Sequence, residues 1–236
     1  MEITLLAHTQ LSDKFRKKLA KYRNVKDSEI LSLTAIRTCY SHLKPTEIVE
    51  VEGGKYFGEI AKDGEGGTES DRLIRHIVRS GHTSTLEHDN YTFAVEGVSR
   101  VLLGQITRHR MYSFSVQSMR YVKFGSEDKS QGMSFVVPDG LEGEALETFL
   151  DAMDQSQVAY DKLRELGVSA EKARMALPLS ASCNFVMTGN LRGILDFYSK
   201  RRKGTHAQDE IQELAELIRK EVEEASPWTT KFFDEI

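Results

Sequence analysis

The sequence predicts an α/β (α+β) fold in which helices accompany one mixed sheet within a single domain. Short stretches of strand-like alternation stand between longer amphipathic helical stretches, as expected when both element types share one core. No linker of biased composition divides the 236 residues, and no internal repeat is present. Length alone allows one or two domains at about 150 residues each. Hydrophobic residues at 39% and charged residues at 29% are typical of an ordinary folded chain.

Periodicity and capping residues place the individual elements. Alternating apolar residues indicate strands, and apolar residues three to four positions apart indicate helices. Ser, Thr and Asp favour helix starts, whereas Gly and Pro favour helix ends. The expected caps are Asp27 or Ser28, Thr68 or Ser70, Ser99, Ser169 and Asn190. The expected strands are residues 2–7, 91–95 and 133–137, and the expected helices are 28–40, 68–81, 99–108, 142–166, 169–177, 190–201 and 208–224.

Bulk properties exclude several classes of protein. The formal net charge of −4 makes the chain a poor generic binder of nucleic acid, so any basic cluster must act locally. No apolar run approaches the ~20 residues that span a bilayer. Residues 1–7 lack the basic region of a signal peptide and predict a first strand. Two cysteines, Cys39 and Cys183, are too few for a disulfide framework and indicate a reducing, cytoplasmic setting.

The most informative stretch is the basic triplet Arg108-His109-Arg110, followed by Ser118 and Arg120. Guanidinium groups match phosphate and carboxylate oxygens bidentately, and hydroxyls add neutral donors. This chemistry fits a site for a phosphorylated small molecule or a nucleic-acid backbone. The alternative is a solvated helix face. Because the triplet follows the apolar run 101–106, we expect it to end a buried helix and to face the interior.

A second polar cluster follows Gly81, where His82, Ser84, Glu87 and His88 crowd one segment. With His76 upstream a metal site is conceivable, but the histidine spacing does not match the common helical zinc motif. The segment is equally explained if its hydroxyls bond their own backbone. Glu87 is also placed to hold His82 in one tautomer. No metal is therefore expected.

A third cluster occupies residues 190–201. Asn190 is expected to cap a helix, and Arg192 with Asp196 has the spacing of a helical surface pair. Arg201 lies at the end of that helix, where cations are favoured. Upstream, Arg174 is the one cation in an apolar stretch, which makes it a candidate for a specific contact.

Together these clusters resemble the flavin-dependent thymidylate synthases. The triplet Arg108-His109-Arg110, then seven residues, then Ser118, is similar to the signature of that family. The further matches occur in the family's order along the chain: Gly81-His82-x-Ser84-x-x-Glu87-His88, Ala173-Arg174-x-x-Leu177-Pro178, Asn190-x-Arg192, His206-Ala207-Gln208 and Pro227-Trp228-Thr229.

The resemblance implies an activity, its co-substrates and an assembly. Members methylate dUMP to dTMP with carbon from methylenetetrahydrofolate, while FAD carries the hydride and NADPH reduces the FAD. They are homotetramers of a non-Rossmann α/β fold, with active sites shared between subunits and no nucleic-acid or membrane partner. This chain agrees in having neither Gly-x-Gly-x-x-Gly after a strand nor a Walker loop.

The resemblance also implies residue roles. Arg201 is the expected catalytic residue, stabilising charge at N3 and O4 of the uracil; it cannot act as a base near neutral pH. The expected FAD contacts are His82, Ser84, Glu87, Arg108, His109, Arg110, Asn190, Leu191, Arg192 and Asp196. The expected dUMP contacts are Gln105, Ile106, Thr107, Arg108, Gln117, Ser118, Met119, Arg120, Arg174 and Arg201.

The sequence departs from the family pattern at Ser115-Val116, where many members carry an amide or an acidic residue. Either Gln117 takes over that contact or the contact is lost. Neither Cys39 nor Cys183 has a neighbouring histidine to activate it, so both are interpreted as packing residues rather than nucleophiles.

Two rival functions remain open from the residues alone. A nucleic-acid-binding module would use cations for phosphates and aromatic rings for stacking on bases. The cations would be Arg108, Arg110, Arg120, Lys123, Arg201 and Arg202, and the rings Tyr112, Phe114 and Tyr121. A metallohydrolase would use His76, His82 and His88. The acidic overall charge argues against the first of these.

Overall fold

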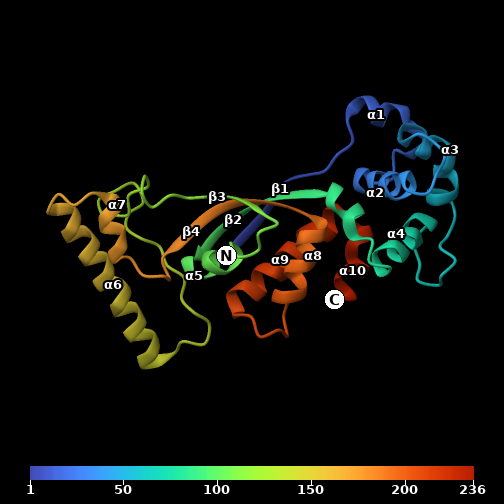
Figure 1. Cartoon of the computed structure of the whole chain (residues 1–236). Coiled ribbons are helices and arrows are strands. Elements are labelled where there is room, and N and C mark those ends of the chain that lie inside the picture. The colour runs from blue at the N-terminus through green and yellow to red at the C-terminus, as the bar shows by residue number, and fades with distance from the viewer. The chain divides into compact units, whose positions relative to one another are not determined.

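The computed structural model describes all 236 residues (Figure 1). The chain divides into two compact units, and each unit gathers three separated stretches. Unit 1 consists of Met1–Thr4, Phe93–Met187 and Arg201–Leu214, and unit 2 consists of Leu5–Thr92, Thr188–Lys200 and Ala215–Ile236. That the whole chain acts as a single domain stays a prediction.

Four antiparallel strands form one sheet in the order β1-β2-β4-β3. They are β1 (Glu2–His8), β2 (Asn90–Ser99), β3 (Ser113–Val116) and β4 (Ser182–Asn190). Within unit 1 the Gly97 amide donates to Asn184 Oδ1 at 2.9 Å. Buried and exposed residues alternate along β4, as expected for a sheet with one covered face. The predicted α/β class is confirmed, whereas the expected mixed sheet is wrong, because the four strands are antiparallel.

Helices make up most of the remaining chain. In order they are α1 (Asp13–Lys18), α2 (Asp27–Thr38), α3 (Pro45–Gly58), α4 (Glu69–Arg79), α5 (Arg100–Ile106), α6 (Gly143–Glu165), α7 (Ala170–Ala173), α8 (Leu191–Arg201), α9 (Asp209–Ala225) and α10 (Thr230–Asp234). Short 3-10 turns are η1 (Ala20–Tyr22), η2 (Thr83–His88), η3 (Arg174–Ala176) and η4 (Pro227–Thr229). None of these helices combines the length and hydropathy needed to span a bilayer.

In unit 1, a buried cluster anchors the chain after β3. Met119 and Phe124 pack with Tyr160 of α6 and with Ala173 at the end of α7. The Tyr160 hydroxyl accepts the Phe124 amide at 3.2 Å, so the one polar atom of this buried ring is satisfied. This cluster fixes the segment that carries Ser118 and Arg120.

In unit 2, α1, α2 and α3 form a separate apolar core around Leu19, Ile30 and Ile48. Gly53 of α3 lies against the Tyr22 ring, where an added Cβ would come within 2.7 Å of the ring. The absence of a side chain at this position therefore allows the close approach.

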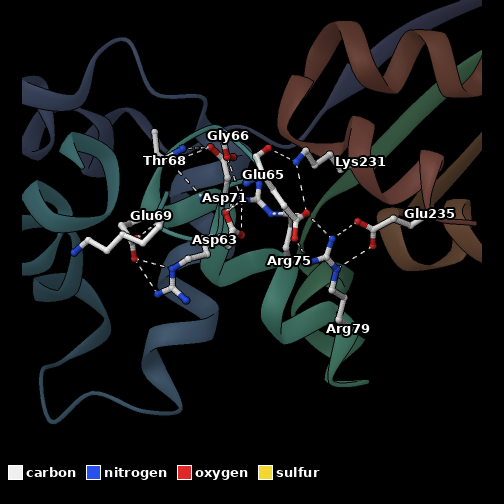
Figure 2. A network of polar contacts seen from close by, with 12 residues as sticks. Asp63, Glu65, Gly66, Thr68, Glu69, Asp71, Arg75, Arg79, Lys231 and Glu235 are labelled. Carbon is white, nitrogen blue, oxygen red and sulfur yellow. Dashed lines mark hydrogen bonds and ion pairs between the residues drawn. The ribbon is translucent and has the colours of Figure 1, made fainter. Parts of the chain in front are cut away.

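A network of charged side chains in unit 2 joins the α3–α4 loop to α4 and to α10 (Figure 2). Arg75 is 5% exposed and donates to both carboxylate oxygens of Asp63 at 3.0 and 2.8 Å and to the Gly66 carbonyl at 3.1 Å. Arg79 makes a fork of two 2.6 Å bonds to Glu65 and also pairs with Glu235. The bonds from Arg79 lower the pKa of Glu65 to about 2.

Several expected boundaries are confirmed. The Thr68 side chain accepts the Asp71 amide at the start of α4, and Ser99 accepts the Leu102 amide at the start of α5. Gly81, beyond α4, has φ +83°, a conformation that glycine adopts without strain.

Other expectations are wrong. Residues 133–137 form no strand, because their only pairing is an isolated bridge between Phe135 and Ala181. Helix α2 begins at Asp27 with Lys26 in the capping position, so neither Asp27 nor Ser28 caps it. Ser169 does occupy the expected N-cap position of α7, although its side chain makes no capping bond.

Asp89 in unit 2 is fully buried with one partner: its Oδ2 accepts the Ser32 hydroxyl at 2.7 Å, while Oδ1 has none. Burial raises the pKa of Asp89 to about 7. As pH falls through 7, the native protein gains a proton that the unfolded chain binds only near pH 4. The free energy of unfolding should therefore rise by about 1 kcal/mol from pH 8 to pH 6 through Asp89.

Urea unfolding of the wild type and of Asp89→Asn at the two pH values tests this expectation. Burial also raises the pKa of Glu29 to about 7, so Glu29 contributes a slope of the same sign that remains in the variant. Asp89→Asn should therefore lose roughly half of the pH dependence. A variant with the full wild-type slope would contradict the assignment to Asp89.

Candidate active site

The predicted site residues fall into two clusters, one in each unit. The unit 1 cluster comprises the residues expected at the nucleotide together with the basic triplet: Gln105, Ile106, Thr107, Arg108, His109, Arg110, Gln117, Ser118, Met119, Arg120, Arg174 and Arg201. The unit 2 cluster comprises His82, Ser84, Glu87, Asn190, Leu191, Arg192 and Asp196.

The basic triplet follows directly on the end of α5. Ile106, the last helical residue, is fully buried, and its carbonyl accepts the His109 amide at 3.0 Å. This tight turn leaves Arg108 and Arg110 exposed and His109 half-buried. The prediction that the triplet faces the interior is therefore wrong for both arginines. The helix ends before the triplet, and permanent charges remain in water because their desolvation is costly.

His109 meets Arg201, which lies 92 residues further along the chain. Arg201 Nε donates to His109 Nε2 at 3.2 Å, and both side chains are partly buried. Arg201 is the last residue of α8, where a cation is favoured by the helix dipole. A residue expected at the flavin and the residue expected to be catalytic are thus in direct contact.

Arg120 and Arg174 are brought together by Glu171 of α7. Arg120 Nε lies 3.1 Å from Glu171 Oε1, and Arg174 Nε donates to the Glu171 carbonyl at 3.0 Å. The Arg120–Glu171 pair is about half exposed, so it contributes well under ~1 kcal/mol and is readily exchanged for another anion. The sequence analysis assigned no role to Glu171. Its position three residues before Arg174, one helical turn away, is the sequence signal that indicates this contact.

The turn after β3 has a structural role of its own. The Ser118 hydroxyl accepts the Arg120 amide at 3.2 Å, and the Ser118 carbonyl accepts the Val122 amide at 2.9 Å. Met119 is buried in the unit 1 core. Its side chain is therefore a packing group, and only its backbone remains a candidate ligand contact.

Two glutamines of the unit 1 cluster already have side-chain partners. Gln105 Nε2 donates to Gln208 Oε1 at 2.5 Å, and Gln117 Oε1 lies 3.5 Å from Asn184 Nδ2 on β4. Gln208 and Asn184 were given no role from sequence. Their partners lie 103 and 67 residues away, so no local spacing reveals these contacts.

In unit 2, Arg192 pairs with Glu87 across 2.5 Å, and Asp196 pairs with Lys200 at 2.7 Å. The expected Arg192–Asp196 pair is therefore wrong, and so is the interpretation that Glu87 holds His82. Arg192 lies in the first turn of α8, where the helix dipole disfavours a cation, and the Glu87 carboxylate compensates for it. Both partners are more than a third exposed, so the pair is exchangeable.

The start of α8 is fixed by two bonds. Asn190 Oδ1 accepts the Gly193 amide at 2.9 Å, which confirms the expected cap. The buried Leu191 donates its amide to the Asp89 carbonyl at 2.8 Å, so the helix is attached to the end of the η2 segment. His82 and Ser84 are exposed on that segment. The seven expected flavin contacts of the unit 2 cluster thus lie on or beside two elements that are joined directly.

Histidine and cysteine positions bear on the rival chemistries. His76, His82 and His88 are all exposed, and no group of three or more His, Cys, Asp and Glu side chains could hold a metal ion. Cys183 is buried, and burial raises the pKa of its thiol, which makes it a poor nucleophile. Cys39 is exposed, so its interpretation as a packing residue is wrong.

The residues present fit a flavin dinucleotide held without a glycine-rich turn. Arg108 and Arg110 are exposed and make no ion pair in the protein, so their guanidinium groups are available to a pyrophosphate. Considered by itself, the unit 2 cluster has an exchangeable guanidinium at Arg192 and exposed polar groups at His82 and Ser84.

Comparisons with known proteins identify the family of the chain. Residues 18–228 match the sequence model of the Thy1 family, described as thymidylate synthase complementing protein. The flavin-dependent thymidylate synthase of Haloarcula marismortui is 37% identical over 70% of this chain and 74% of that protein. The enzyme of the same name from Geobacter sulfurreducens is 33% identical over 86% of this chain and 81% of that protein.

A solved structure shares the fold. The UMP/dUMP methylase PolB from Streptomyces cacaoi, bound with 5-Br dUMP, superposes with a TM-score of 0.74 at 23% identity, covering 100% of this chain and 95% of that one. The fold and the two clusters define an α/β protein with exposed arginine side chains and without a glycine-rich phosphate-binding turn. The chain belongs to the flavin-dependent thymidylate synthase family.

Proposed function

We propose that this protein catalyses the reductive methylation of dUMP to dTMP, with methylenetetrahydrofolate as carbon donor and NADPH as the reductant of bound FAD. Family membership supports the reaction class. For this chain, the proposed reaction is supported by the contact between Arg201 and His109. This contact holds the Arg201 guanidinium beside the basic triplet.

Arg201 is the proposed catalytic residue. Its Nε is occupied by His109, which leaves the terminal guanidinium nitrogens free to donate to a planar imide such as uracil. Donors aimed at O4 and N3 stabilise negative charge on the ring and so raise the nucleophilicity of C5. Since Arg stays protonated near neutral pH, its contribution is electrostatic.

The substrate phosphate is assigned to the arginines around Glu171. Arg120 and Arg174 converge on that residue, and the weak Arg120–Glu171 pair can be exchanged for a phosphate oxygen. Ser118 and the Met119 backbone add neutral donors on the neighbouring turn. Gln105, Ile106, Thr107, Arg108 and Gln117 complete the proposed dUMP contacts.

The flavin is assigned to Arg108, His109 and Arg110 and to the unit 2 cluster. When bound, FAD supplies the hydride for the methyl group. Arg108 and Arg110 would hold its phosphates, while Glu87, Asn190, Leu191, Arg192 and Asp196 would contact the cofactor near the start of α8. His82 and Ser84 provide exposed polar groups on η2.

We also propose that the enzyme is a cytoplasmic homotetramer in which active sites are shared between subunits. Several large apolar side chains of unit 1 are exposed in the isolated chain, among them Met111, Tyr121 and Met175. Exposed apolar surface of this kind is typical of subunit interfaces.

A product assay tests the proposed function. Purified protein is incubated with dUMP, methylenetetrahydrofolate, NADPH and FAD, and each component is omitted in turn. We expect a flavin absorbance spectrum in the protein after gel filtration, and dTMP only when dUMP, methylenetetrahydrofolate and NADPH are all present. Added FAD should be needed only by protein that has been stripped of its bound flavin. No dTMP in the complete mixture, together with affinity for single-stranded DNA that falls steeply with salt, would instead support the nucleic-acid-binding alternative.

A further inference from the structure

His109 differs from its two arginine neighbours in its environment. Arg108 and Arg110 are exposed, whereas His109 is half-buried and directed to Arg201. If His109 served only to contact a phosphate, it would not need to be more buried than Arg108 and Arg110, which are exposed on either side of it. The geometry therefore indicates a second task for this imidazole, directed at Arg201.

The direction of this hydrogen bond requires an acceptor on the imidazole. Arg201 has no acceptor, so the 3.2 Å contact is a hydrogen bond only if His109 Nε2 carries no proton. The ring is then neutral, with its proton on Nδ1. A doubly protonated ring would place two cations in contact and would remove the acceptor.

The imidazole is itself held in place. The His109 amide donates to the Ile106 carbonyl at 3.0 Å, and the His109 carbonyl accepts the amide of the buried Tyr112 at 3.3 Å. The ring then begins a series of aromatic contacts, with centroids 6.5 Å from His109 to Tyr112, 6.1 Å from Tyr112 to Phe114 and 6.0 Å from Phe114 to Phe185. This series connects the orientation of His109 to the sheet.

We propose that His109 is a positioning residue, which in its neutral form fixes the plane of the Arg201 guanidinium against the uracil ring. The proposal rests on the catalytic role proposed for Arg201. A guanidinium bound at Nε has little freedom left to rotate about its stem, so its terminal donors are aimed before substrate arrives. His109 thus acts through Arg201, whatever contact it also makes with the cofactor.

Three variants separate this role from a merely structural one. Gln presents an oxygen acceptor near the position of Nε2, Ala presents none, and Lys places a second cation beside Arg201. We expect His109→Gln to keep kcat within about fivefold, and His109→Ala and His109→Lys to lose about 10- to 100-fold in kcat. The KM for dUMP and the amount of bound flavin should change far less than kcat.

The matched control is His42→Gln, which changes an exposed histidine of unit 2 and should leave kcat unchanged. If His109→Ala fails to fold, as judged by thermal unfolding, the Gln and Lys variants carry the comparison. Equal kcat in all folded His109 variants would overturn the proposal, as would a common loss that follows flavin content. Full activity in Arg201→Lys would refute the role of Arg201 instead, so the two failures are distinguishable.

Discussion

Replacing Arg201 with lysine is expected to lower kcat for dTMP formation by about 10²- to 10³-fold, the range seen when a single preorganised donor to a developing anion is removed. The variant keeps the positive charge but loses the planar fork and the Nε that bonds to His109. A flexible ammonium group can sit near uracil without presenting two donors to O4 and N3 at once. The loss should therefore appear in kcat more than in substrate binding.

Flavin content and steady-state rates measured on the same preparation test the Arg201 prediction. We expect bound FAD close to the wild-type level, because Arg201 is not itself among the proposed flavin contacts. Arg23→Lys is the matched control, since it makes the same chemical change at an exposed position of unit 2. Near-normal turnover in Arg201→Lys would remove Arg201 from the catalytic role.

The second large effect is expected on stability. Arg75 lies at the centre of the charged network in unit 2, 5% exposed, with Asp63 and the Gly66 carbonyl as acceptors (Figure 2). Arg75→Leu keeps the apolar stem but leaves these acceptors without their donor. We expect the free energy of unfolding to fall by about 2 kcal/mol, less than the ~3–5 kcal/mol for a fully buried pair, because Asp63 can take up water.

Urea unfolding followed by fluorescence measures the Arg75 prediction directly. Trp228, the one tryptophan in the chain, lies in η4 immediately before α10. Lys231 of α10 and Glu235, which directly follows α10, belong to the same network. Lys220→Leu is the control, because the Lys220–Glu224 pair is exposed and its loss should cost less than ~0.5 kcal/mol. Equal destabilisation by both substitutions would mean that the burial of Arg75 adds nothing.

Local sequence signals predicted the regular part of the fold well. Thr68, Ser99 and Asn190 cap helices as expected, because a capping bond spans only three residues and is encoded locally. The failed strand at 133–137 shows the opposite case. Its alternation satisfies the local rule, but pairing depends on a partner distant in sequence, and only one isolated bridge forms, between Phe135 and Ala181.

The candidate site shows the same division more sharply. The motifs identify the site residues but do not indicate which side chains bind one another. Arg192 binds Glu87, which is 105 residues away, rather than Asp196, which is four residues further along the helix. Local spacing favours the near partner by only a few tenths of a kcal/mol, which any well-placed distant carboxylate can exceed. The Arg201–His109 contact likewise spans 92 residues and has no local signature.

The interleaving of the two units along the chain limits how this protein can be taken apart. The chain passes from unit 1 to unit 2 and returns to unit 1 twice. Cutting the chain at one position therefore cannot separate the two units intact. Neither candidate cluster is encoded by one continuous stretch of sequence, so fusion or duplication of a single gene segment would not transfer it. Grafting one of them onto another scaffold would require transplanting several disconnected segments together.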